Sequence, residues 1–267
     1  MRSKPVSALS LIFLTVFVDL LGFGILIPIL PTFAKTELNV DETAIGIAIA
    51  AYSLTQFFFN PVFGNLSDKH GRKKIIVITL LINAIGYVLF AFTHSYFMLL
   101  FARVISGVGG SSIGVAQAYI ADITTAQNRS KGMGIIGAAF GLGFVFGPLI
   151  GGFLSKYGYF LTGIVSASFS FAAFILTIFL LPETISKVPQ LQTRTRKLID
   201  IESFKIIFKR PNIGIVVTLF FILTFSVANI YGTFALLGFK IYGFTDRENG
   251  YLYAILGLSS ALIQGFL

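Results

Sequence analysis

Long apolar runs, separated by shorter polar stretches, set the pattern of the whole chain. Several of these runs exceed the ~18 apolar residues that mark a membrane-spanning helix. The pattern predicts eight spans, at residues 7–34, 43–66, 75–93, 96–121, 132–155, 159–181, 212–239 and 249–267. We therefore expect an all-α polytopic membrane helix bundle.

The composition supports a membrane protein and excludes several kinds of chemistry. The 267 residues are 55% hydrophobic and only 12% charged, which is far more apolar surface than a water-soluble domain needs. Cysteine is absent, so disulfides and cysteine metal sites are excluded. The two histidines, His70 and His94, fall in predicted connections, and the sequence shows no catalytic triad or phosphate-binding loop. We therefore expect no enzymatic activity, no metal site and no cofactor.

The net charge of +9 is distributed unevenly along the chain. Most of the 20 Lys and Arg lie at the N-terminus or in the connections after the second, fourth and sixth spans. The opposite connections carry Lys35, Lys156, Lys240 and Arg247. Basic connections remain in the cytoplasm, so this asymmetry predicts a cytoplasmic N-terminus. The excess charge then sets membrane orientation, and a nucleic-acid partner is not expected.

The longest polar segment follows the sixth span and is also basic. Pro182 ends that span, because proline cannot continue a helix. The chain is therefore predicted to contain a six-helix half at residues 1–181, a basic cytoplasmic linker at 182–211 and two further helices at 212–267.

Two charged residues fall inside predicted spans. Asp19 has no cation near it in sequence, and Arg103 is the cation inside the fourth span. A carboxylate in lipid is costly, so Asp19 should face a cavity or a partner. Asp19 lies about 12 residues into its span, ~18 Å deep, and Arg103 lies ~10 Å from the other face of a ~30 Å core. A direct or water-bridged Asp19–Arg103 pair is therefore our hypothesis, and Pro28 and Pro31 should break or bend the first span farther on.

Polar side chains recur at helical spacing in three spans. Gln56 and Asn60 lie four residues apart on one face of the second span, Gln117 ends a small polar face of the fourth, and Asn229 belongs to a mild polar stripe of the seventh. Such rows form either helix interfaces or cavity walls. These four residues are candidate substrate contacts, and satisfied hydrogen bonds between helices are the alternative.

The connection at residues 64–74 is short, polar and basic. Its cations, which include Arg72, outnumber its single anion, Asp68. Gly64 permits close backbone approach, and Gly71 permits the left-handed conformation of a tight reversal. The charge alone is explained by membrane orientation.

Glycine repeats every four residues in the fifth span and is followed by proline. The residues are Gly143, Gly147, Pro148, Gly151 and Gly152. This spacing predicts a tightly packed, kinked helix.

Four motifs together resemble the signatures of the major facilitator superfamily of transporters. They lie at residues 19–31, 64–74, 99–111 and 143–152, in that superfamily's order. The combination is most similar to the drug:proton antiporter branch and, within it, to tetracycline:proton antiporters. Ser106 departs from the glutamine usual in the third of these motifs.

The resemblance implies the major facilitator fold, with a six-helix N-terminal half and about two helices of the second half present here. It implies that Asp68 and the cations after it form a cytoplasmic latch and that the fifth-span glycines favour export. It also implies that Asp19 carries protons and that Arg103 tunes the proton binding of Asp19.

The function implied is secondary active export of a small amphipathic, tetracycline-like drug in exchange for protons across the inner membrane of a bacterium. Its partners are then that small molecule, protons and the lipid bilayer, and a divalent metal would arrive only with the substrate. Two alternatives remain open: a proton-coupled uptake carrier for a sugar or metabolite on the same fold, and a truncated fragment that does not transport, because the ninth to twelfth spans are missing.

Overall fold

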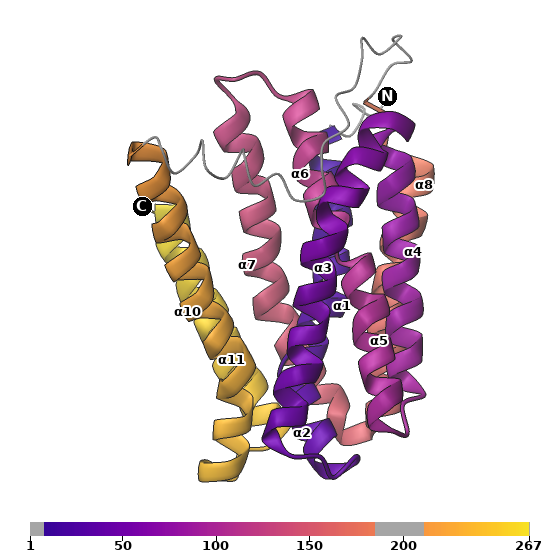
Figure 1. Ribbon diagram of the computed structural model, residues 1–267, viewed down its shortest axis with the longest axis vertical. Coiled ribbons are helices and arrows are strands. Elements are labelled where there is room, and N and C mark those ends of the chain that lie inside the picture. Colours follow the sequence, from indigo (N-terminus) through magenta and orange to yellow (C-terminus); the bar gives the residue numbers. More distant parts are fainter. Residues whose placement is uncertain (1–7, 185–210, 267) are drawn as a thin grey trace, which may run out of the picture.

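The computed structural model describes residues 8–184 and 211–266, which form helices and no strands (Figure 1). Within this described part, seven helical segments are long and apolar enough to cross a membrane. The prediction of an all-α polytopic membrane bundle is confirmed. Of the predicted linker, residues 185–210 lie outside the described residues.

Interruptions divide two of the spans. The first consists of α1 (Ala8–Leu26) and α2 (Ile29–Thr36), with Pro28 as the N-cap of α2. The predicted proline break is therefore confirmed. The fourth consists of α5 (Tyr96–Gly109) and α6 (Ser112–Ile123), interrupted at Gly110, a break that the sequence did not predict.

The connection predicted at residues 64–74 is largely helical, so that expectation was wrong. Helix α3 (Glu42–His70) continues to His70, and α4 (Arg72–Ala91) begins two residues later. Polar residues such as these sustain a helix that projects beyond an apolar layer. Gly71 alone separates the helices, with φ +99°, as its left-handed role requires. Nothing lies within 4 Å of a Cβ placed on Gly64, so the close approach expected there is absent.

The remaining helices follow the predicted order. Helix α7 (Arg129–Leu154) keeps Pro148 inside it and passes through the short 3-10 helix η1 (Ser155–Tyr157) to α8 (Tyr159–Leu180). Helices α10 (Pro211–Tyr242) and α11 (Asp246–Phe266) correspond to the last two predicted spans. The 21 residues of α11 form a helix but are not among the seven segments that meet the membrane criterion.

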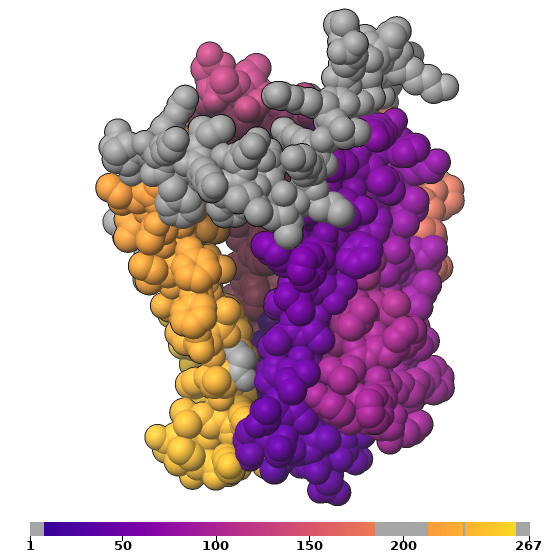
Figure 2. All heavy atoms as spheres, in the orientation of Figure 1, coloured from indigo at the N-terminus to yellow at the C-terminus, as the bar shows by residue number. Residues whose placement is uncertain are grey.

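Helix α1 lies inside the N-terminal group of helices, packed against α7 and α8, while α4 packs against α5 and α8. Helix α11 packs on α7, and α10 contacts α2 and α11. Figure 1 shows α10 and α11 standing beside the N-terminal helices, with α2 at one end of the bundle (the α2 end) and the α3–α4 break at the other. The surface is hollowed between α10 and α3 (Figure 2).

Candidate functional site

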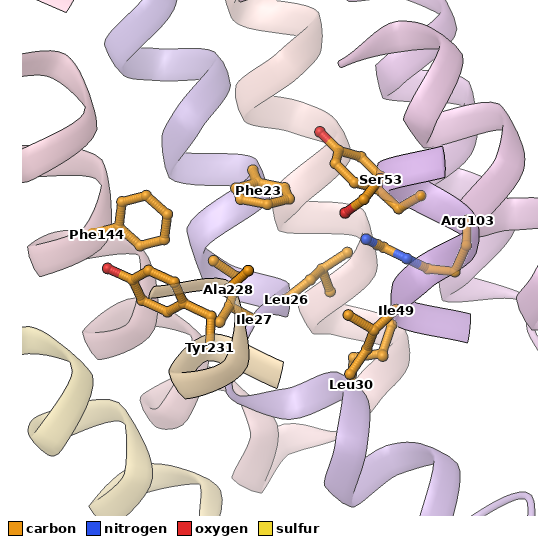
Figure 3. Close-up of a pocket in the computed structure, with 11 residues that line it drawn as sticks. Phe23, Leu26, Ile27, Leu30, Ile49, Ser53, Arg103, Phe144, Ala228 and Tyr231 are labelled. Atoms are coloured by element: carbon orange, nitrogen blue, oxygen red, sulfur yellow. The ribbon is translucent and has the colours of Figure 1, made fainter. Parts of the chain in front are cut away.

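A cavity of about 200 Å³ lies between the N-terminal helices and α10 (Figure 3). Residues of α1, α2, α3, α5, α7 and α10 contribute to its wall, so both groups of helices border it. The lining residues are mostly aromatic or aliphatic: Phe23, Leu26, Ile27, Leu30, Ile49, Tyr52, Ser53, Arg103, Phe144, Ala228 and Tyr231.

Aromatic rings form a continuous path along this wall. The ring of Phe23 stacks on Tyr52, with 5.1 Å between centroids, and meets Phe144 edge-on at 6.2 Å. Phe144 in turn stacks on Tyr231 of α10 at 4.7 Å. The cavity therefore offers flat apolar surfaces from α3 across to α10, suited to a planar apolar group.

Of the described residues that line this cavity, Arg103 is the charged one. It is only 6% exposed, and its Cζ lies 4.7 Å from the centroid of the Tyr52 ring. Its Nε has no hydrogen-bond partner among the described residues. In Figure 3 the guanidinium extends from α5 into the cavity. The site therefore combines apolar rings with one buried cation.

Asp19 points instead into the N-terminal group of helices. Its carboxylate accepts hydrogen bonds from Asn83 Nδ2 at 2.8 Å, from Ser112 Oγ at 3.1 Å and from Ser170 Oγ. It is 4% exposed and is not among the residues that line the cavity. No ion pair joins Asp19 to Arg103 in the part of the chain that the structure describes. The three donors connect α1 to α4, α6 and α8 instead.

The four predicted substrate contacts do not line this cavity. Gln56 Nε2 donates to the carbonyl oxygen of Gly110 at 2.7 Å, which is the interhelical alternative. Asn60 and Gln117 are exposed. Asn229 donates to a carbonyl of its own helix and borders a separate hollow along α10.

The residues that do line the cavity were not selected from the sequence, apart from Arg103. Phe144 and Tyr231 lie in spans that also expose phenylalanines, such as Phe146 at 46% and Phe220 at 68%. Their residue type gives no signal that separates a cavity wall from a lipid-facing surface. Tyr52 shares a face with Gln56, and that polar face was the one usable signal.

Arg72 ties together several helix ends beside the α3–α4 break. Its guanidinium pairs with Asp68 at 2.6 Å and with Asp122, at the end of α6, at 2.9 Å. It also donates to Ser67 Oγ at 2.6 Å, and its backbone N–H donates to Glu183 after α8 at 2.9 Å. These contacts join the ends of α3, α4, α6 and α8, in the place where the resemblance to the superfamily implies a latch.

The glycines of α7 bring its backbone against α1. A Cβ on Gly147 would lie 2.6 Å from the Cα of Gly24, and one on Gly143 would lie 2.9 Å from Leu20 Cβ. A Cβ on Gly151 would collide with the carbonyl oxygen of Ile25. The close packing predicted for the fifth span is therefore present, and we call this contact the α1–α7 seam.

The other side of the same α7 segment meets α11. A Cβ on Gly152 would lie 2.6 Å from the carbonyl oxygen of Asp246. A Cβ on Gly250 would lie 2.5 Å from the carbonyl oxygen of Pro148. Backbone therefore packs on backbone between the two groups of helices as well.

Polar contacts join the two groups at the α2 end. Lys240 of α10 pairs with Glu42 of α3 at 2.7 Å, and Tyr159 of α8 donates to Asp246 Oδ2 of α11 at 3.2 Å. Asp246 is 7% exposed, so the second contact is shielded from water. The helix groups therefore meet closely at this end.

These features define a multi-pass α-helical membrane protein in which two groups of helices border an apolar cavity. A family model of the Major Facilitator Superfamily matches residues 12–267, and the chain belongs to that superfamily.

Similar proteins carry names that refer to drug resistance. Multidrug resistance protein 2 of Bacillus subtilis is 30% identical over 255 residues, which are 94% of this chain and 63% of that protein. Multidrug resistance protein 1 of the same organism is 35% identical over 250 residues, 93% of this chain and 62% of that protein. The tetracycline resistance protein, class C, of Escherichia coli is 30% identical over 266 residues, 99% of this chain and 67% of that protein. The chain spans less than two thirds of either Bacillus relative.

Solved structures show the same fold. The human organic anion transporter MFSD10 (TETRAN) aligns with a TM-score of 0.77 and 23% identity, over 97% of this chain and 71% of that one. A bacterial homologue of the human lysosomal transporter Spinster, in an inward-facing conformation, aligns with a TM-score of 0.74 and 19% identity, over 96% and 60%. The predicted major facilitator fold is confirmed.

Proposed function

We propose that this chain forms the substrate cavity of a secondary transporter that exports small amphipathic drugs in exchange for protons. The observation that carries the proposal is the cavity itself, where aromatic rings and one cation lie between two groups of helices. Transporters of this architecture hold substrate between their halves. The names of the multidrug and tetracycline resistance relatives support a drug as the substrate.

The membrane placement in this proposal is the inner membrane of a bacterium, with the N-terminus in the cytoplasm. The distribution of Lys and Arg supports that orientation. The cavity of about 200 Å³ is open on one side and is smaller than the roughly 300–1,000 Å³ that encloses a drug-sized ligand, so a drug bound here would extend beyond it. A tetracycline-like compound would bring any divalent metal with it.

Asp19 is the proposed proton carrier. As a carboxylate it only accepts hydrogen bonds, and its three partners on α4, α6 and α8 all donate to it. Protonation adds a donor and removes the charge that strengthens these bonds. Binding a proton would therefore weaken the attachment of α1 to three other helices. Since α1 also carries Phe23 of the cavity wall, the proton and the substrate would act on the same helix.

The test measures proton-driven drug flux in inverted membrane vesicles containing the protein that carries this chain. An imposed pH gradient, acidic inside, should drive a fluorescent amphipathic drug into the vesicles. Asp19→Asn should abolish this pH-driven flux. The matched control is Asp41→Asn: Asp41 is exposed and caps α3, and asparagine caps helices equally well.

Three outcomes would overturn the proposal. Coupling retained in Asp19→Asn would remove the proton-carrying role. Proton-driven accumulation of a sugar or metabolite in right-side-out vesicles, without drug export, would favour the uptake carrier. Flux in neither direction, from protein that is folded and inserted, would refute transport by this protein.

A further inference from the structure

The charge of Arg103 is not compensated by any carboxylate in the described part of the chain. The residue is more than nine-tenths buried, and its Nε is without a hydrogen-bond partner. The buried carboxylate of Asp19 already accepts hydrogen bonds from three donors and makes no ion pair with Arg103 in the described part of the chain. A buried cation without an anion costs free energy, because its hydration is lost and little replaces it.

The contact with Tyr52 replaces only part of the lost hydration. A guanidinium 4.7 Å from a ring centroid is attracted to the electron-rich face, but a ring supplies no hydrogen-bond acceptor for the fork of N–H groups. The guanidinium projects into the cavity, where a ligand could supply those acceptors (Figure 3). A planar carboxylate fits the fork better than any neutral group, since it accepts two parallel N–H bonds.

The rest of the cavity constrains the remainder of that ligand. Apart from the hydroxyl groups of Tyr52, Ser53 and Tyr231, the wall is apolar. The stacked pairs Phe23–Tyr52 and Phe144–Tyr231 present ring faces and edges to the cavity. Among the described residues no Asp or Glu lines it, so a ligand cation would find no anion among them and would be repelled by Arg103.

We propose that this cavity selects small aromatic organic anions, with the carboxylate or enolate on the Arg103 guanidinium and the ring among Phe23, Phe144 and Tyr231. The inference rests on the proposed transport function and narrows its substrate class from amphipathic drugs to anionic ones. Arg103 is then a substrate-binding residue rather than only a neighbour of the proton site.

Equilibrium binding of three matched probes tests this selection without any proton gradient. The probes are 2-naphthoate, neutral 2-naphthamide and cationic 2-naphthylmethylammonium, measured by calorimetry on the purified protein in a non-ionic detergent. A charge-assisted bond pair should make naphthoate bind about tenfold tighter than naphthamide. The cationic probe should bind most weakly of the three.

Variants then locate the selectivity. Arg103→Gln should bring naphthoate and naphthamide to within about twofold of each other, while Arg103→Lys should keep part of the preference for the anion. Tyr231→Leu should weaken all three probes and leave their ratios unchanged, because it removes a ring and no charge. The control is Arg247→Gln, since Arg247 is also an arginine beside a tyrosine ring but is exposed on α11.

The outcomes separate this inference from the proposed function. Equal affinity for naphthoate and naphthamide in the unmodified protein would overturn the anion site, whatever the vesicles show. Anion preference that survives in folded Arg103→Gln protein would also overturn it. Anion preference that depends on Arg103, in a protein that drives no drug flux, would leave the binding site standing and refute export.

Discussion

Gly147→Ala is predicted to weaken the α1–α7 seam measurably. The added Cβ would lie 2.6 Å from Gly24 Cα, 2.7 Å from Gly24 C and 3.0 Å from Ile25 N. All three are backbone atoms, which cannot rotate away as a side chain can. Ordinary contact begins near 3.4 Å, so α1 and α7 must separate locally by about 0.8 Å.

The magnitude follows from two opposing effects. Overpacking of this kind costs ~1–3 kcal/mol. Alanine favours a helix over glycine by up to ~1 kcal/mol, which offsets part of that cost. The difference is about 0–2 kcal/mol, and because the added Cβ meets backbone atoms that cannot rotate away, the net loss in free energy of unfolding should lie in the upper half of that range. In a protein that already carries Gly147→Ala, the further change Gly24→Ala should destabilise less than Gly24→Ala does in the unmodified protein, because both changes open the same contact.

Thermal unfolding of the purified protein, followed by far-ultraviolet circular dichroism, measures this loss. Gly134→Ala is the matched control, since it lies on the same helix and nothing is within 4 Å of its added Cβ. The control should be as stable as the unmodified protein or slightly more so. If Gly147→Ala and Gly134→Ala unfolded at the same temperature, the added Cβ at the seam would not cost stability, and the argument from the backbone contact would be wrong.

Two other contacts give predictions of different kinds. Arg72→Ala breaks ion pairs to two carboxylates beside the α3–α4 break. Because those carboxylates are partly exposed, the free energy of unfolding should fall by only about 1–3 kcal/mol in the same thermal assay. Tyr159→Phe removes the hydrogen bond to Asp246, which weakens closure at the α2 end by ~1 kcal/mol. Thr32 lies at this end and is 5% exposed. In a protein carrying Thr32→Cys, the added change Tyr159→Phe should make the cysteine react about fivefold faster with a maleimide.

Each of these two predictions has a matched control. Lys74→Ala removes an exposed cation next to Arg72 and should change stability by less than ~0.5 kcal/mol. Tyr157→Phe alters a neighbouring tyrosine that is 59% exposed and should leave the labelling rate unchanged. A loss for Lys74→Ala as large as that for Arg72→Ala, or equal labelling in both tyrosine variants, would contradict the role assigned to the contact. The chain has no cysteine of its own, so labelling carries no background.

The order and approximate bounds of the helices could be predicted because the length and hydropathy of a span depend on local sequence. The proline break after α1 and the left-handed Gly71 were predictable for the same reason. The helical extension of α3 to His70 was not, because polar residues fit a projecting helix as readily as a loop.

The candidate site was less accessible from sequence. Counting residues placed Asp19 and Arg103 at similar depth, but it does not give the rotation of each helix about its axis. In the structure Asp19 turns toward Asn83 and Arg103 turns toward Tyr52, so similar depth did not produce a direct pair. The rotation depends on packing across the whole bundle, which no single span encodes.

The backbone-to-backbone packing of α7 has a consequence for motion. Interdigitated side chains resist sliding, because each must change rotamer to pass its neighbour. The α7–α11 contact has few such obstacles at Gly152 and Gly250, where carbonyl groups meet Cα atoms. If one group of helices rolled over the other, we would therefore expect little side-chain repacking at these two glycines. The energy barrier to that rolling should come mainly from the polar contacts Lys240–Glu42 and Tyr159–Asp246. Breaking these two contacts should therefore lower the barrier more than changing the side chains beside the two glycines.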